Sequence, residues 1–163
     1  MIHLTAARMA GLALLLMIPM GMASAQLPPS VVMMTQDEIK ALPPLDPTVA
    51  PGSPSNTAIV GSRTKPGFWV ERVSFPANFI HYPHSHPDDR TYTVISGTLH
   101  LGFGDKLVET RLKAMPPGSF WTEPANVNHF LVTRNEPITF QVSGNGPSGT
   151  KFVDPAHDPR NKK

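Results

Sequence analysis

The stretch "HYPHSHPDDRTYTVISG" (81–97) decides both the fold and the site. It places His84 and His86 two residues apart and continues into a β-rich run that ends at Gly97. Residues i and i+2 of a β-strand point to the same face, so both imidazoles can reach one metal ion. The spacing therefore predicts a metal site on a β-strand, although a pair of histidines is weak evidence by itself.

The first 25 residues predict an export signal. A weakly basic start without acidic residues precedes the apolar run "MAGLALLLMIPMGM", which is short for a membrane span and contains Pro19. The small residues at 23–25 predict cleavage after Ala25. We therefore expect a periplasmic or secreted protein without a membrane partner after cleavage.

The composition narrows the range of functions. Of the 163 residues, 138 remain after the expected cleavage, and they carry 13 basic and 12 acidic side chains. This length suits one domain, and the near-neutral charge gives no reason to expect a nucleic acid as partner. The chain has no cysteine, so any metal must be held by nitrogen and oxygen atoms.

The rest of the chain divides by its composition. Residues 26–56 form a proline-rich arm in which "TQDEIKAL" predicts one short helix, with Thr35 and Glu38 as a capping box. Short β-rich runs such as "FWVERVSF" and "ITFQVSG" fill residues 57–154, with Gly, Pro and Asn between them, and 155–163 form a tail. This pattern predicts an all-β sandwich or barrel. The run "KLVETRLKAM" could be a short helix or a strand.

A second stretch, "PPGSFWTEPANVNHF" (116–130), adds a third histidine, His129. With both stretches in place, the chain resembles the cupins, which are small double-stranded β-helix (jelly-roll) barrels. The first cupin motif matches at His84, His86 and Gly97, and the second matches at Pro117, Gly118, Pro124 and His129. The resemblance covers roughly residues 68–154. More narrowly, "HPDDRTYTVISGT" and "FVDPAHDPR" are similar to a branch of exported single-domain cupins.

Four positions depart from the cupin motifs. Asn78 and Asn126 stand where the family has glycine, and Thr133 stands where it has asparagine. Asparagine tolerates a positive φ, so we expect the turns to survive. The fourth departure concerns the chemistry, because Arg90 occupies the place of the family's glutamate ligand. An arginine has no lone pair to give to a metal.

The resemblance implies a metal site made of His84, His86 and His129. It also implies one divalent transition ion, with iron first and manganese, nickel, zinc or copper as alternatives. Cupins with three histidine ligands include dioxygenases, so the leading hypothesis is a non-haem dioxygenase-type oxidoreductase that acts on a small anionic substrate. The alternatives are a non-catalytic small-molecule or metal-binding cupin and a metal-assisted isomerase or lyase. The resemblance also implies a homodimer, in which the arm covers a sheet edge.

Arg90 has several interpretations. It could clamp a substrate carboxylate in bidentate fashion, which would make it a catalytic and substrate-binding residue. Equally, it could pair with Asp88 or with Glu123 and be structural. Asp88 or Asp89 could instead become a fourth ligand, or Arg90 could exclude the metal and leave an anion-binding pocket.

Other residues are candidates by the alternation of strand faces. Tyr92 should point into the same cavity as Arg90, either as a core residue or as a proton donor and substrate contact. Gln141 would bind substrate if it faces inward. His81 is expected at the barrel mouth, and His100 and His157 are expected at the surface.

Overall fold

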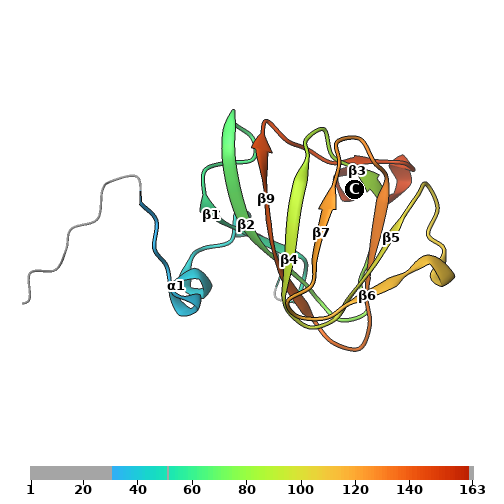
Figure 1. Cartoon of the computed structure of the whole chain (residues 1–163), viewed down its shortest axis with the longest axis horizontal. Helices are drawn as coiled ribbons and strands as arrows, with labels where there is room; N and C mark the ends of the chain where they lie inside the picture. The colour runs from blue at the N-terminus through green and yellow to red at the C-terminus, as the bar shows by residue number, and fades with distance from the viewer. Residues whose placement is uncertain (1–30, 51, 162–163) are drawn as a thin grey trace, which may run out of the picture. The chain divides into compact units, whose positions relative to one another are not determined.

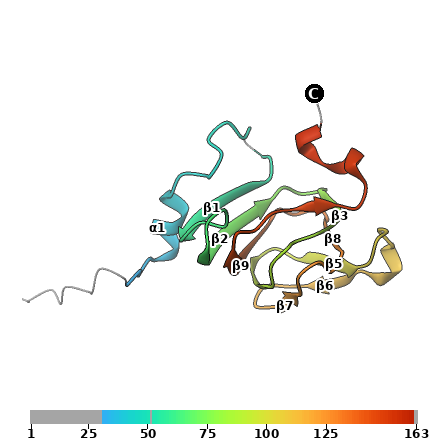
Figure 2. The same ribbon diagram turned by 90° about the horizontal axis from the view of Figure 1, so that it is seen from above.

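The computed structural model describes residues 31–50 and 52–161, and within them ten strands form two five-stranded antiparallel sheets that face each other (Figures 1 and 2). The first sheet has the order β1 (Ser55–Val60), β2 (Gly67–Phe75), β9 (Ile138–Gly146), β4 (Arg90–Ser96) and β7 (Phe120–Glu123). The second has the order β10 (Lys151–Phe152), β3 (Ile80–Ser85), β8 (His129–Thr133), β5 (Leu99–Phe103) and β6 (Lys113–Met115). The predicted all-β jelly-roll barrel is confirmed. The expected export signal, 1–25, lies outside the described residues.

Short helical segments lie outside the sheets. The helix α1 (Gln36–Ala41) begins at Thr35, whose hydroxyl accepts from the backbone N–H of Glu38 while the Glu38 carboxylate accepts from the backbone N–H of Thr35, as the capping box predicted. The ambiguous run "KLVETRLKAM" contains both alternatives, the 3-10 segment η1 (Glu109–Arg111) and the strand β6. The 3-10 segments η2 (Pro155–His157) and η3 (Pro159–Asn161) follow β10. Among the described helices, none combines the length and the apolar character that a membrane crossing requires.

The core lies between the two sheets and follows the alternation of the strands. On β4, Arg90, Tyr92 and Val94 are buried, whereas Thr91 is exposed. On β7, Trp121 is buried and Phe120 is exposed, so these neighbours point to opposite faces as expected. The buried apolar cluster includes Trp69, Phe75, Tyr92, Leu99, Trp121 and Phe140. Because one face of each sheet is apolar, the sheets can pack only with these faces together.

The turns explain why the departures from the cupin motifs are tolerated. Asn78 and Asn126, at the two glycine positions, both adopt a positive φ, 57° and 62°. Thr133 ties the turn before β3 to β8, because its hydroxyl accepts from the Phe79 N–H at 2.8 Å and donates to the Pro76 carbonyl at 2.6 Å. Gly97 keeps the motif glycine at φ 71°, where a Cβ would lie 2.4 Å from the Pro137 carbonyl oxygen.

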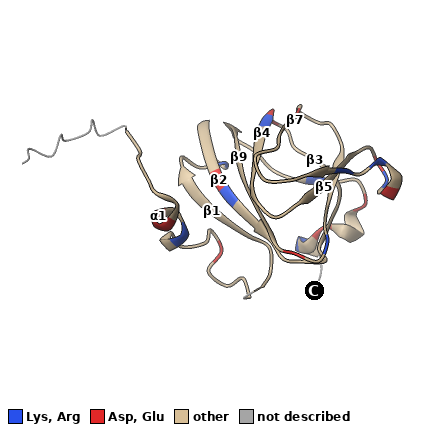
Figure 3. Ribbon diagram, turned by 60° about the horizontal axis from the view of Figure 1, so that its bottom comes forward, with Lys and Arg blue, Asp and Glu red and all other residues tan. Residues whose placement is uncertain are grey.

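Basic and acidic residues are interspersed along the described elements, as the colours of the ribbon in Figure 3 show. The segment that precedes β1 is joined to that edge strand by a hydrogen bond from the Leu45 N–H to the Asn56 carbonyl, 2.7 Å long. The mixture of basic and acidic residues along the described elements agrees with the near-neutral composition.

Candidate metal centre

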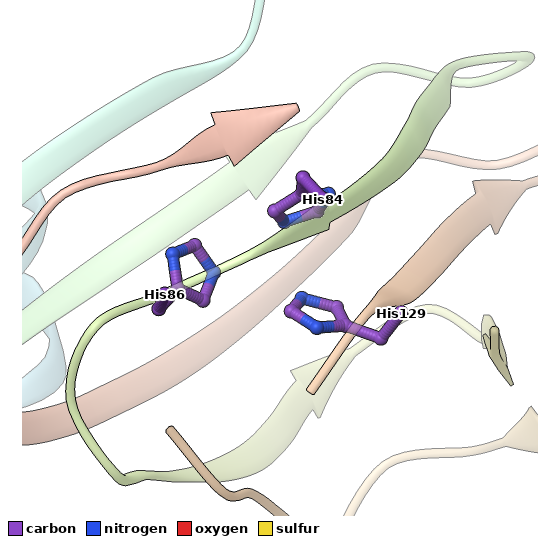
Figure 4. A group of neighbouring side chains, drawn as sticks. All are labelled: His84, His86 and His129. Carbon is purple, nitrogen blue, oxygen red and sulfur yellow. The ribbon is translucent and has the colours of Figure 1, made fainter. Parts of the chain in front are cut away.

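Three histidines meet inside the barrel. His84 lies on β3, His86 follows the end of that strand, and His129 begins β8, directly opposite His84 in the strand register. One ring nitrogen of each lies within 4.8 Å of the others, and Figure 4 shows the rings converging. All three side chains are buried. The structure thus brings together the three residues that the sequence proposed as ligands.

Backbone carbonyls fix the orientation of each ring. The Nδ1 atoms lie 2.7 Å from the Tyr82 carbonyl for His84, 2.7 Å from the Gly149 carbonyl for His86 and 3.2 Å from the Val127 carbonyl for His129. A carbonyl oxygen only accepts, so each Nδ1 carries the hydrogen and each Nε2 keeps its lone pair. This is the tautomer that binds a metal through Nε2.

The histidines are neutral over a wide pH range. Burial lowers the pKa of His84 to about 3 and that of His129 to about 4. Burial also lowers the pKa of His86, and the positive charge of Arg90 adds to this effect. Neutral imidazoles are competent ligands, so protons compete little with a metal for these nitrogens.

Glu123 supplies the carboxylate that the first motif lacks. It ends β7, is 1% exposed, and its Oε2 lies 3.2 Å from His129 Nε2 and 3.8 Å from His86 Nε2. An ion about 2.1 Å from each ligand atom would hold neighbouring ligand atoms about 3.0 to 3.4 Å apart. The position of Glu123 therefore suits a fourth ligand, a role that the sequence did not assign to it.

The atoms of Glu123 and His129 that face each other fit a metal ion. Glu123 Oε2 and His129 Nε2 are both buried without a hydrogen-bond partner. Because the His129 hydrogen is on Nδ1, two acceptors face each other, and only a cation or a proton between them removes the repulsion. The other carboxylate oxygen, Oε1, accepts from Trp121 Nε1 at 3.0 Å, which leaves Oε2 free for the ion.

Without an ion, Glu123 holds a proton more tightly than usual. Burial raises the pKa of Glu123 to about 7, although hydrogen bonds from Trp121 and Tyr92 act in the opposite direction. Tyr92 is buried and stacks on Trp121 at a centroid distance of 4.6 Å. Burial raises the pKa of Tyr92 well above its usual value, and the charge of Glu123 adds to this effect. The phenol therefore keeps its proton beside the carboxyl group.

Arg90 forms an ion pair with Asp88 and donates hydrogen bonds to the loop that contains Ser148 and Gly149. Its Nε donates to Asp88 Oδ1 at 3.3 Å, and its Nη2 donates to the Gly149 carbonyl at 3.2 Å and to the Ser148 hydroxyl. This is the pairing with Asp88, one of the alternatives that the sequence left open. Because the same Gly149 carbonyl accepts from His86, Arg90 holds the group that orients a candidate ligand.

The acidic residues of the first motif lie away from the ion position. Asp88 is occupied by Arg90, and Asp89 Oδ1 accepts from the Ala125 N–H at 2.7 Å. The structure therefore does not place either carboxylate as the fourth ligand. Glu123, directly opposite Arg90 in the register of β4 and β7, is instead the carboxylate that lies beside the histidines.

Two sequence expectations are corrected by strand geometry. Gln141 lies between the inward-facing Phe140 and Val142, and it accepts from Arg72 Nη2 at 3.2 Å on the other face of β9. Gln141 is therefore not part of the cavity lining. His81 was expected at the mouth, but a register shift between His81 and His84 places its ring 3.8 Å from that of His84.

Two further histidines within the described residues, His100 and His157, lie elsewhere. His100 is partly buried on β5, and its Nδ1 has no hydrogen-bond partner. His157 stacks on Tyr82 at a centroid distance of 3.7 Å. Neither belongs to the histidine group of the metal centre.

The candidate ligands open into a cavity of about 400 Å³. Its lining includes the three histidines, Arg90 and Tyr92, together with apolar side chains from β2, β8 and β9. This volume is at the small end of the range for small-molecule sites. The arrangement can hold an ion and one compact organic molecule beside it.

Several solved structures have folds similar to that of this chain. A polyketide cyclase, RemF from Streptomyces resistomycificus, matches with a TM-score of 0.61 and 19% identity, over 78% of this chain and 90% of that one. A cupin-superfamily sugar phosphate isomerase from Silicibacter pomeroyi matches with a TM-score of 0.54 and 23% identity, over 75% and 82%. The DMSP lyase DddQ from Ruegeria pomeroyi matches with a TM-score of 0.53 and 14% identity, over 78% of this chain and 59% of that one. These likenesses show the cupin fold.

The comparison of sequences gives a family without an assigned activity. No curated protein matches the chain. A family model described as "Domain of unknown function (DUF4437)" matches residues 30–162, which include every candidate ligand. The chain belongs to the DUF4437 family and has the fold of a cupin.

Proposed function

We propose that this protein is a metal-dependent enzyme in which His84, His86, His129 and Glu123 hold one divalent transition ion. The facing lone pairs of His129 Nε2 and Glu123 Oε2, 3.2 Å apart and buried, are the observation that supports this proposal. Three neutral imidazoles and one carboxylate would leave a net charge of +1 on the centre. Coordination positions would remain open toward the cavity for a small molecule.

We propose proton transfer, as in a metal-assisted isomerase or lyase, as the reaction. A bound ion would act as a Lewis acid on a substrate oxygen. Tyr92 would carry the proton, because it lines the cavity together with the histidines and burial raises the pKa of its hydroxyl. In its deprotonated form the Tyr92 oxygen would take the α-proton of a carbonyl substrate, whose C–H electron pair would form the enolate. The resulting hydroxyl would return the proton to carbon, so the protons balance over the cycle. The cyclase, isomerase and lyase activities named for the three similar structures lie within the same fold.

A dioxygenase-type oxidoreductase is the second candidate. It is favoured by the open positions beside three neutral histidines, which suit Fe(II) with a substrate and oxygen as additional ligands. The resemblance of this chain to cupins with only three histidine ligands is weaker than the sequence suggested, because the Glu123 carboxylate lies 3.2 Å from His129 Nε2.

One experiment separates the two reactions. Metal-loaded protein would be incubated with dihydroxyacetone in D₂O, and deuterium incorporation would be followed by NMR beside an oxygen electrode. We expect deuterium incorporation that is lost in Tyr92→Phe and kept in Tyr82→Phe, the matched control at the other tyrosine. Oxygen uptake without deuterium incorporation would favour the dioxygenase. The absence of both from protein that holds its metal would contradict the proposed chemistry and leave the non-catalytic binding module.

Export and assembly are part of the proposal. We propose that cleavage after Ala25 delivers the protein to the periplasm or beyond, and that two copies form a homodimer. Phe120, 60% exposed on the edge strand β7, is an apolar side chain that such pairing would bury. The mass of the secreted chain and its light-scattering mass in solution would test these two points.

A further inference from the structure

The charges around the cavity bear on the kind of molecule it binds. Three arginines line it, and each is already paired with a carboxylate of the protein. Arg63 Nη1 lies 3.0 Å from Glu71, Arg90 Nε lies 3.3 Å from Asp88, and Arg160 Nη2 lies 2.6 Å from Asp158. One reason to expect an anionic substrate was that Arg90 could clamp a carboxylate, and the pairing of Arg90 with Asp88 removes this reason.

The three ion pairs differ in how deeply they are buried, and the deepest pair also disfavours an anionic ligand. The side chains of Arg63 and Arg160 are 40% and 65% exposed, so water screens their charges at the rim. Arg90 is the deep arginine, and its side chain is 9% exposed with the partner Asp88 at 7%. An anion that recruited Arg90 would leave the Asp88 carboxylate buried without its partner. Glu71, the partner of Arg63, is buried on the wall while Arg63 is half-exposed, so its carboxylate would also oppose such an anion.

Trp69 brings a buried donor without a hydrogen-bond partner into the lining. Trp69 is 1% exposed, lines the cavity, and its Nε1–H makes no hydrogen bond. An indole N–H can only donate, and a buried donor without a partner is costly, so its position calls for an acceptor atom from outside the protein. The other tryptophan of the chain, Trp121, also donates from a buried Nε1, but to Glu123.

Much of the remaining wall is apolar, and Asn56, His81, Tyr92 and Thr150 are its polar side chains. Phe75, Phe140, Val142 and Phe152 face the cavity from β2, β9 and β10. A molecule that fills this volume therefore exchanges water for aromatic and aliphatic contacts over most of its surface. Such contacts favour an uncharged body over an ionised one.

We propose that the cavity selects a compact, uncharged molecule with an apolar or aromatic body and an acceptor oxygen that receives the Trp69 Nε1–H. This rests on the proposed function, since the other end of the molecule binds the metal held by the histidines. Trp69 is then a residue that determines specificity, and Arg90 is not a substrate clamp.

The test uses two probes that share their metal-binding end and nearly share their shape. 3,4-Dihydroxybenzamide is uncharged at its amide, and 3,4-dihydroxybenzoate is anionic at the same place. Binding of each to the zinc-loaded and to the metal-free protein would be measured by calorimetry. We expect the amide to bind at least about tenfold more tightly than the benzoate in both forms. Trp69→Phe should weaken amide binding by about three- to tenfold at unchanged zinc content.

Trp121→Phe is the matched control, because the Nε1–H of Trp121 is already bonded to Glu123. It should change zinc affinity and leave the ratio of amide to benzoate binding intact. Melting temperatures would show that both variants fold. Equal binding of the two probes, tighter binding of the benzoate, or no binding of either would overturn the inference. If zinc fails to bind while the metal-free protein still prefers the amide, the proposed metal function fails and the specificity of the cavity stands.

Discussion

Replacement of Glu123 by glutamine gives the sharpest prediction about the centre. Glu123→Gln removes the charge, keeps the size and leaves an amide oxygen to accept from Trp121. Since the pKa of Glu123 is about 7 in the metal-free protein, about 0.9 of the carboxyl groups carry a proton at pH 6. An ion that binds Glu123 must displace this proton. The three histidines release none, because burial keeps them neutral at that pH.

Zinc binding at pH 6 should therefore release about 0.9 proton per ion from the wild-type carboxyl group and none from the variant. Titration calorimetry in two buffers with different ionisation enthalpies measures this number. The difference between wild type and variant isolates Glu123 from the bound water, which both proteins share. Glu109→Gln, at a carboxylate that is 59% exposed and pairs with Arg134, is the control and should behave as wild type.

Equal proton release in wild type and Glu123→Gln would refute the reasoning. It would mean that the proton comes from the histidines or from water, and that Glu123 does not bind the ion. Weaker zinc binding in the variant, by about 10- to 100-fold, should accompany the lost proton release if Glu123 is a ligand or orients one.

Three further predictions concern Glu123, Arg90 and the turn at Asn126. The folded pKa of Glu123 exceeds its unfolded value of 4.5, so the metal-free wild type loses stability as the pH rises from 4.5 to 7, by at most about 3 kcal/mol. Denaturation at pH 8 should therefore find metal-free Glu123→Gln more stable than the wild type. Zinc should reduce or reverse this difference in stability. Arg90→Gln should weaken zinc binding about 10-fold, because the Gly149 carbonyl that orients His86 loses its hydrogen bond from Arg90. It should also lower the melting temperature, because Asp88 loses its partner. Chelator competition and calorimetry measure the two effects, and an unchanged melting temperature with lost substrate affinity would support a role of Arg90 in binding the substrate instead. Since φ is 62° at Asn126, Asn126→Gly should leave the free energy of unfolding nearly unchanged and Asn126→Ala should lower it by about 1 kcal/mol. Urea denaturation measures both, and a less stable glycine variant would contradict this prediction.

Much of the fold and the histidine group could be predicted from local spacing. The His84–His86 interval predicts a shared face at the end of β3, with His86 just beyond its last residue, and the second motif carries its own turn before His129. Asn78 and Asn126 substitute for glycine without harm because they adopt the positive φ that those turns require. Each of these features depends on a few consecutive residues.

The rest depends on pairing between distant strands. Glu123 meets the histidines only because β7 lies beside β4 in a register that puts it opposite Arg90. The inward position of His81 depends on a register shift within β3 and β8. Gln141 could not be placed on either face until the alternation of β9 was known. Asp88 was a foreseeable partner of Arg90, but its two other partners, Ser148 and Gly149, come from a loop 58 and 59 residues away in sequence.

The most direct measurement is the metal content per chain of the untagged protein after equilibration with iron, manganese and zinc in turn. The account predicts about one tightly bound ion per chain, lost in His84→Ala/His86→Ala and held more weakly in Glu123→Gln. A chain that binds none of these metals, while remaining folded, would contradict it. The facing atoms of Glu123 and His129 would then share a proton, and the cavity would be a binding site without a metal.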